Sequence, residues 1–238
     1  MNSHNIFCIP NQSFDGNNVT IKGPELRHVV NVLRKRKGEE ITVTDGRGYK
    51  YQVRIAEIGK SSLVAQILNK QHVPRKSPLE IAVGFVPLKG LRNDSIIEKG
   101  TELGVVRFIG FISEHSVIRN VGVQKIKRWK NIAESAMVQS QQYYLPEVII
   151  VRNTEELMLL SSAYESILIT EPGGKAAVPI GAKRVMLLVG PEGGFSQSER
   201  DFFVEHGASL LSLGPTRLRS ETAAIVGISK ILAAYGVI

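Results

Sequence analysis

The chain has 238 residues, 43% of them hydrophobic, so it is long enough for one large domain or two ordinary ones with packed cores. It carries 30 basic and 22 acidic residues, a net charge of +8 that favours a nucleic-acid partner over an anionic membrane surface. The single cysteine, Cys8, excludes an internal disulfide and a cysteine-cluster metal site. We see no signal peptide and no apolar run near the ~20 residues of a membrane helix, so we expect a cytoplasmic protein without a membrane partner.

Residues 1–72 are expected to form a small β-barrel with one helix. Asp45-Gly46-Arg47-Gly48 is typical of a hairpin turn between two strands. The helix is expected to begin after Gly23-Pro24 and to end at Gly38, because apolar residues recur between them at helical spacing. The expected strands are Ile6–Ile9, Val19–Ile21, Glu40–Thr44, Tyr49–Ile58 and Leu63–Leu68.

A run of four cations, Arg34-Lys35-Arg36-Lys37, closes the expected helix. Cations complement the negative end of a helix dipole, but four in succession exceed that need and favour a patch that contacts phosphates. Arg27 and His28 lie on faces of the helix that the apolar residues leave available. For His28 the pattern alone favours an ordinary surface histidine over a base contact.

Residues 73–78 contain two prolines and no periodicity, so we expect them to link the barrel to a second domain over 79–238. Strands and helices alternate there, which predicts an α/β fold with a parallel sheet covered on both faces. Small residues in the last helix permit close packing, either within the subunit or at a dimer interface. The expected strands are Leu79–Val86, Arg107–Ile112, Val148–Val151, Ile167–Thr170, Val185–Val189 and Leu210–Leu213, and the expected helices are Arg92–Leu103, Gln124–Gln142, 153–162, 197–206 and 221–235.

Two loops near the C-terminus are the strongest candidates for a ligand site. Gly190–Ser196 and Leu213–Ala223 each follow an expected buried strand and lead into a helix, a position at the sheet edge where α/β proteins bind ligands. Ser196 and Glu199 fit a helix capping box, and Ser220 and Glu221 also fit a helix start. Glu192 and Arg219 have no such structural explanation. Dinucleotide, P-loop, hydrolase and metal-site motifs are absent from the sequence, so we expect no metal.

These loops resemble the RsmE family of SPOUT-class methyltransferases, which use S-adenosylmethionine to methylate N3 of a uridine in 16S (small-subunit) ribosomal RNA. The resemblance implies a PUA-like RNA-binding barrel, a C-terminal parallel sheet with a deep trefoil knot, and a homodimer. It covers the whole chain. The residues that carry it are Gly190-Pro191-Glu192-Gly193-Gly194-Phe195, Leu213-Gly214-x-x-x-Leu218-Arg219-x-Glu221-Thr222-Ala223, Lys99-x-x-Glu102-Leu103-Gly104-Val105, Trp129, Gln139-Ser140 and His28-x-x-x-Val32-Leu33-Arg34.

The resemblance also implies the roles of the site residues. Arg219 is expected to stabilise the uridine anion, and Glu221 or Glu192 to accept the proton or orient the base. For Glu221, a purely structural role as a helix-start charge is an equal alternative. S-adenosylmethionine is expected to contact Thr170, Glu171, Gly190, Pro191, Glu192, Gly193, Gly194, Leu213, Gly214, Leu218, Ser220 and Thr222. RNA contacts are expected from Arg27, His28, Arg34, Lys35, Arg36 and Lys37, on an assembled small subunit.

One residue departs from the family pattern. Gln142 stands three positions after Gln139, where the family usually has an arginine, so a glutamine replaces a cation that could contact a phosphate of the target. Two other functions stay open at this point: another SPOUT RNA methylation, such as ribose 2′-O methylation, and a catalytically inactive RNA-binding factor in ribosome assembly.

Overall fold

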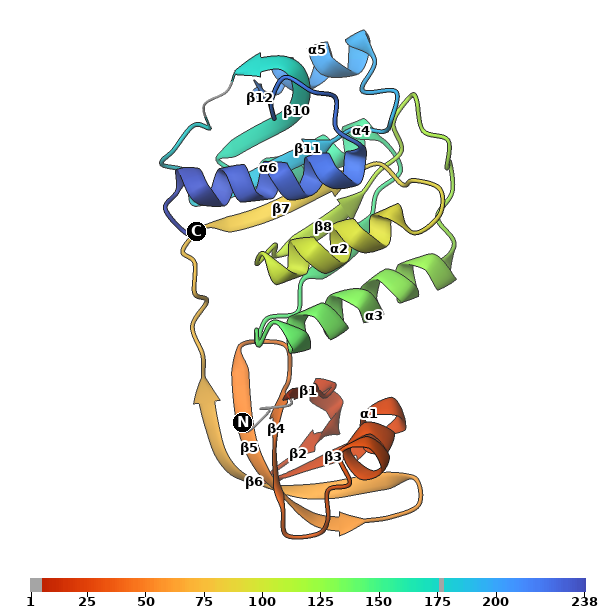
Figure 1. Cartoon of the computed structure of the whole chain (residues 1–238), viewed down its shortest axis with the longest axis vertical. Coiled ribbons are helices and arrows are strands. Elements are labelled where there is room, and N and C mark those ends of the chain that lie inside the picture. Colours follow the sequence, from red (N-terminus) through yellow and green to blue (C-terminus); the bar gives the residue numbers. More distant parts are fainter. Residues whose placement is uncertain (1–5, 176–177) are drawn as a thin grey trace. The chain divides into compact units, whose positions relative to one another are not determined.

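The computed structural model describes residues 6–175 and 178–238, which form two compact units (Figure 1). The first unit comprises the chain up to Lys76 together with Met137–Leu145, and the second comprises Ser77–Ala136 and Pro146–Ile238. The sequence predicts a second domain that runs without interruption over 79–238, whereas in the structure residues 137–145 belong to the first unit. Backbone hydrogen bonds explain why: the Gly48 N–H donates to the Tyr143 carbonyl at 2.7 Å, and the Leu145 N–H donates to the Gly46 carbonyl at 2.8 Å.

The first unit is a curled six-stranded sheet in the order β1-β4-β5-β6-β3-β2. β1 is parallel to β4, and the other neighbours are antiparallel. Alternate side chains, such as Val53 and Ile55 of β5, enter the core with at most 1% exposure, as expected of a sheet with one buried face. The strands are β1 (Ile6–Cys8), β2 (Phe14–Asp15), β3 (Asn18–Lys22), β4 (Glu40–Thr44), β5 (Tyr49–Ile58) and β6 (Ser62–His72).

The helix of this unit is shorter than the sequence predicts. α1 (Gly23–Arg27) continues into a π-helical turn, His28–Val32, and the helical backbone ends there rather than at Gly38. Arg34 has a φ of 53°, in the left-handed region, which is incompatible with a continuing helix. The cations Arg34–Lys37 therefore lie in a loop after the helix rather than in its last turn. A single 3₁₀ turn, Asn11–Ser13, precedes β2.

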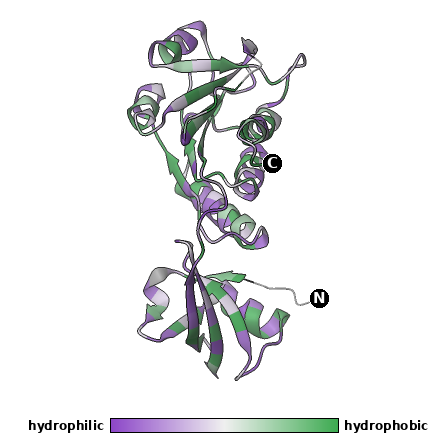
Figure 2. Ribbon diagram, turned by 90° about the vertical axis from the view of Figure 1, so that its left-hand side faces the viewer, coloured by the Kyte–Doolittle hydropathy of each residue, from purple (hydrophilic) through white to green (hydrophobic). Residues whose placement is uncertain are grey.

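The second unit is built on a parallel sheet in the order β12-β10-β11-β7-β8-β9. Its central strands are continuous apolar runs because both faces of the sheet are covered. Figure 2 shows them as mostly hydrophobic ribbons, whereas the first sheet alternates in hydropathy. The strands are β7 (Glu80–Phe85), β8 (Arg107–Gly110), β9 (Glu147–Ile150), β10 (Ser166–Lys175), β11 (Arg184–Val189) and β12 (Ala208–Leu211).

Helices pack on both faces of this sheet. Side chains of α2, α3 and α6 share one core with Val83 and Leu187, and side chains of α4 and α5 share another with Met186 and Leu188. Alternation along β11 thus directs successive residues to opposite layers. The helices are α2 (Arg92–Glu102), α3 (Val123–Gln139), α4 (Thr154–Ser161), α5 (Gln197–Glu205) and α6 (Ser220–Ala234).

Among the small residues of α6, Ala223, Ala224 and Gly227 are buried within the subunit, whereas Ala233 and Ala234 are exposed. A β-carbon added at Gly227 would lie 2.8 Å from Cδ2 of Leu187, so the helix approaches β11 more closely than a larger residue permits. In the described part of the chain, no helix combines the length and the apolar character needed to cross a membrane.

Candidate functional site

The loops that follow β11 and β12, together with residues 170–172 of β10, surround a cavity of about 400 Å³, a size that suits a small organic ligand or cofactor. Residues from the start of α6 complete its wall. Every residue expected to contact S-adenosylmethionine lines the cavity except Thr222, which is exposed. The lining residues are Thr170, Glu171, Pro172, Val189, Gly190, Pro191, Glu192, Gly193, Gly194, Arg200, Leu213, Gly214, Pro215, Thr216, Arg217, Leu218, Ser220 and Ala223.

The glycine loop, Gly190–Gly194, follows a path that requires small residues. Gly194 has a φ of 74°, in the left-handed region, and a β-carbon at Gly190 would lie 3.3 Å from the Phe195 ring. The Ser220 hydroxyl donates a hydrogen bond to the Gly190 carbonyl at 2.8 Å, which ties the loop to α6. Ser220 therefore does not act as the N-cap that the sequence also allowed; Arg219 occupies that position without a side-chain cap.

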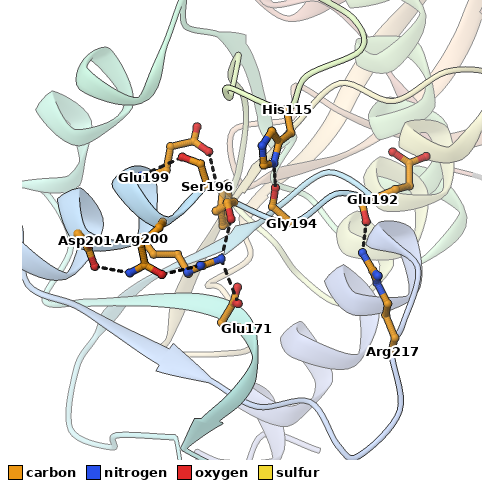
Figure 3. Close-up of polar contacts among 11 residues, drawn as sticks. His115, Glu171, Glu192, Gly194, Ser196, Glu199, Arg200, Asp201 and Arg217 are labelled. Atoms are coloured by element: carbon orange, nitrogen blue, oxygen red, sulfur yellow. Dashed lines mark hydrogen bonds and ion pairs between the residues drawn. The ribbon is translucent and has the colours of Figure 1, made fainter.

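The buried carboxylate of Glu199 accepts a hydrogen bond at 2.9 Å from the N–H of Ser196, two residues after the glycine loop (Figure 3). Ser196 and Glu199 form the capping box expected at the start of α5. The Glu199 carboxylate also accepts hydrogen bonds from the Ser113 hydroxyl at 3.1 Å and from the Glu114 N–H at 2.9 Å. These two residues belong to the loop after β8, so one side chain joins two loops at the same edge of the sheet.

The wall of the cavity carries charges of both signs. Arg200 Nη1 lies 3.5 Å from Oε1 of Glu171, and both side chains are half-buried. The Arg217 guanidinium donates to the Glu192 carbonyl, and the Glu192 carboxylate forms an ion pair with Arg92, the first residue of α2. A wall of this kind is suited to a ligand that itself bears both positive and negative groups.

The three residues expected to be catalytic occupy different positions. Glu192 lines the cavity. Arg219 and Glu221 flank the lining residue Ser220 but do not line the cavity themselves. Arg219 is exposed, whereas Oε2 of Glu221 is buried and makes no hydrogen bond with any described residue.

The residues expected to contact RNA lie in the first unit, not in the unit that holds the cavity. Lys35 forms an ion pair with Glu39 at 3.1 Å. The His28 ring packs edge-on against Phe7 with 5.4 Å between ring centroids. The remaining exposed side chains of this set are Arg27, Arg34, Arg36 and Lys37.

Several residues of the site were not identified by the sequence analysis. His115 Nδ1 lies 3.1 Å from the Gly194 carbonyl oxygen, so the loop after β8 also contacts the glycine loop directly. That loop follows a parallel strand, and the rule that ligands bind at this edge applies to it as well. Arg217 lies within the selected loop Leu213–Ala223, but Arg200 and Arg92 gave no local signal. No cluster of three potential metal ligands occurs among residues 6–175 and 178–238.

Comparison with known proteins identifies two family models along the chain. Residues 75–232 match the family model of the RNA methyltransferase domain, and residues 21–68 match that of the RNA methyltransferase PUA domain. The ribosomal RNA small subunit methyltransferase E of Aquifex aeolicus is 33% identical over 91% of this chain and 94% of its own length. The enzyme of the same name from Bacillus subtilis is 27% identical over 89% and 88%.

Solved structures show the same similarity. The ribosomal RNA small subunit methyltransferase E from Neisseria gonorrhoeae, bound to S-adenosylmethionine, is 30% identical with a TM-score of 0.82 and 96% of each chain covered. A methyltransferase from Legionella pneumophila, also in complex with S-adenosylmethionine, is 30% identical with a TM-score of 0.86 and 97% of each chain covered.

Proposed function

Because the chain belongs to the ribosomal RNA small subunit methyltransferase E (RsmE) family, we propose that it methylates N3 of a uridine in 16S ribosomal RNA with S-adenosylmethionine as the methyl donor. One observation carries the proposal. The two loops that bear the family's motifs meet around one cavity, and that cavity has the size and mixed charge of a cofactor site.

The residues present fit S-adenosylmethionine. Exposed backbone of the glycine loop would hold the polar parts of the cofactor, and the apolar Leu213 and Leu218 would flank its adenine. Glu171 and Arg200 supply opposite charges for its amino-acid group. When bound, the cofactor would supply a methyl group on a positively charged sulfur. The leaving group is then a neutral thioether, which needs no help from an acid.

The protein's own groups must then prepare the uridine. N3 of uridine carries a proton and is a poor nucleophile until that proton is lost. Arg219, exposed beside the cavity, stabilises the resulting anion by donating hydrogen bonds to a carbonyl oxygen of the base. The loops fix the base against the cofactor, which lowers the entropic part of the barrier.

Two carboxylates compete for the role of proton acceptor, and their contacts favour Glu221. The carboxylate of Glu192 is engaged by Arg92. Oε2 of Glu221 is buried and has no hydrogen-bond donor among the described residues. A buried carboxylate oxygen without a partner is unfavourable in the free protein, and a base that brought its N3 proton within hydrogen-bond distance of Oε2 would remove that cost.

The experiment is nucleoside mass spectrometry of 16S ribosomal RNA from cells with and without the gene. We expect 3-methyluridine to be lost on deletion and restored by the intact gene, but not by Arg219→Ala. Arg152→Ala, which removes an exposed arginine paired with Glu156, is the matched control and should restore the modification. Unchanged 3-methyluridine after deletion would refute the proposal. A different methylated nucleoside would redirect it to another RNA methylation.

We further propose three features that accompany this function in the family: a trefoil knot, a homodimer and action on an assembled small subunit in the cytoplasm. The strand order supports the knot, because the chain from β11 must cross β10 to reach β12. An experimental structure in which the C-terminal segment does not thread a loop would refute the knot.

Light scattering of the purified protein tests the proposed dimer. Methylation of free RNA compared with methylation of isolated small subunits tests the proposed substrate.

A further inference from the structure

One edge of the first unit carries a row of aromatic and cationic side chains that no motif of the sequence singled out. We call it the aromatic edge; it consists of Tyr49, Lys70, His72, Arg75 and Tyr144. In the register of β5 and β6, Tyr49 pairs with His72, and their rings lie 5.2 Å apart between centroids. Lys70 Nζ lies 4.2 Å from the centroid of the Tyr49 ring, and both Lys70 and His72 are exposed.

Tyr144 lies in Met137–Leu145, the second segment of the first unit, and contacts two other residues of the aromatic edge, His72 and Arg75. Its hydroxyl lies 3.0 Å from Nε2 of His72. Its ring rests on Gly48, where an added β-carbon would lie 2.3 Å from Cζ. The guanidinium carbon of Arg75 lies 4.2 Å from the centroid of the ring, so the exposed Arg75 is supported by an aromatic surface.

The charge around this edge is strongly positive. The segments 45–51, 69–76 and 141–145 contain a single acidic residue, Asp45. Its carboxylate is already engaged, because it accepts hydrogen bonds from the Arg47 N–H at 2.8 Å and from the Tyr51 hydroxyl at 3.2 Å. The cations in the same segments are Arg47, Lys50, Lys70, Arg75 and Lys76. A surface of this composition attracts an anionic chain.

We propose that the aromatic edge binds a single-stranded stretch of the RNA substrate, with one unstacked base on the guanidinium of Arg75 and phosphates against Lys70 and its neighbours. Planar cations and aromatic rings are the surfaces on which proteins stack the splayed bases of RNA. The inference rests on the proposed function as an RNA methyltransferase. It adds a surface that contains none of the residues expected from the sequence to contact RNA, namely Arg27, His28 and Arg34–Lys37.

The test uses the full chain and a single-stranded RNA that contains 2-aminopurine, a base whose fluorescence falls when it stacks. Arg75→Lys keeps the charge but removes the flat guanidinium. We expect it to weaken binding roughly tenfold, as for the loss of one stacked base, and to abolish the fluorescence decrease. Arg54→Lys is the matched control, because Arg54 is an exposed arginine of β5 that pairs with Glu40, and it should change neither quantity.

Two further variants separate stacking from charge. Lys70→Gln should weaken binding to all sequences alike and lower the salt slope by about 1, with the fluorescence decrease retained. Tyr144→Leu should reproduce the loss of stacking through removal of the support beneath Arg75. Melting curves establish that each variant is folded. If Arg75→Lys and Tyr144→Leu both bind and quench like the unsubstituted chain, the aromatic edge is not an RNA site.

That failure is distinguishable from failure of the proposed function. A protein that forms 3-methyluridine in cells but is insensitive to Arg75→Lys and Tyr144→Leu overturns only the aromatic edge. A protein that forms no 3-methyluridine and binds no RNA in any variant overturns both.

Discussion

The hydroxyl of Ser113 donates a hydrogen bond to the carboxylate of Glu199 at 3.1 Å, although the two residues are 86 positions apart in the chain. Ser113 lies after β8, and Glu199 lies in the first turn of α5. The glycine loop ends just before that turn. Because Glu199 is only 8% exposed, water competes little for its hydrogen bonds. The glycine loop is therefore held by a contact outside the cavity that it lines.

Glu199→Ala should destabilise this region because the Glu199 carboxylate is buried and accepts several hydrogen bonds. The variant leaves three donors, the Ser113 hydroxyl and the N–H groups of Glu114 and Ser196, without their acceptor. We expect the free energy of unfolding to fall by about 2–3 kcal/mol and the affinity for S-adenosylmethionine to fall with it. Urea unfolding and calorimetry measure the two quantities. Glu205→Ala, an exposed glutamate at the end of the same helix, is the control, and equal midpoints for both variants would contradict the expectation.

Glu221→Gln and Glu192→Gln should have different kinetic effects. Loss of a general base typically costs about 10²–10⁴-fold in rate, so single-turnover methyl transfer should fall by that order in Glu221→Gln at unchanged cofactor affinity. Glu192 lines the cavity and pairs with Arg92, so Glu192→Gln should instead weaken cofactor binding. Rapid-quench assays at saturating cofactor separate the two effects. The reverse outcome would assign proton transfer to Glu192.

Gly174→Ala should weaken the pairing of β10 with β12. A β-carbon at Gly174 would lie 2.8 Å from the Leu210 carbonyl carbon and 2.9 Å from that of Leu211. Backbone atoms cannot move aside as a side-chain end can, so we expect a loss of about 1–3 kcal/mol in the free energy of unfolding. Gly122→Ala is matched to it, because nothing lies within 4 Å of a β-carbon there. Chemical denaturation should show a clear loss for Gly174→Ala alone.

Stability of the first unit should fall in strongly alkaline solution. Burial, reinforced by the neighbouring Asp45 carboxylate, raises the pKa of Tyr51 to about 12. The unfolded chain has a tyrosine pKa of about 10, so the folded protein holds the phenolic proton more tightly. This stabilisation is complete below pH ~10 and is lost as the pH rises from ~10 toward the folded pKa. Denaturant titrations over that range should show the loss, and Tyr51→Phe should reduce its slope; an unchanged slope would exclude Tyr51 as its source.

The sequence predicted local features well where the responsible interactions are local. The bounds of β4 and β5 agree with expectation, because alternation and a hairpin turn act over a few residues. The capping box of Ser196 and Glu199 was predicted for the same reason. The predicted end of the first helix, at Gly38, was wrong. Nothing in a run of four cations indicates that the backbone of Arg34 is left-handed.

Contacts between side chains far apart in the chain were not predicted. Nothing near Glu199 indicates that Ser113 will share its carboxylate, and nothing near Arg92 indicates an ion pair with Glu192. Pairing of this kind depends on which loops the parallel sheet brings to one edge. The sequence indicates that edge, but the partners along it depend on the three-dimensional path of each loop.

The return of Met137–Leu145 to the first unit constrains how the protein is made and divided. On a translating ribosome, all of Ser77–Ala136 emerges before the segment that supplies partners to the Gly48 N–H and the Gly46 carbonyl. A fragment that stops at Lys76 lacks those partners and leaves Gly48 without its covering tyrosine ring. Exchange of this unit between relatives therefore requires three junctions rather than one, and a graft made at the proline-containing linker alone leaves one piece behind.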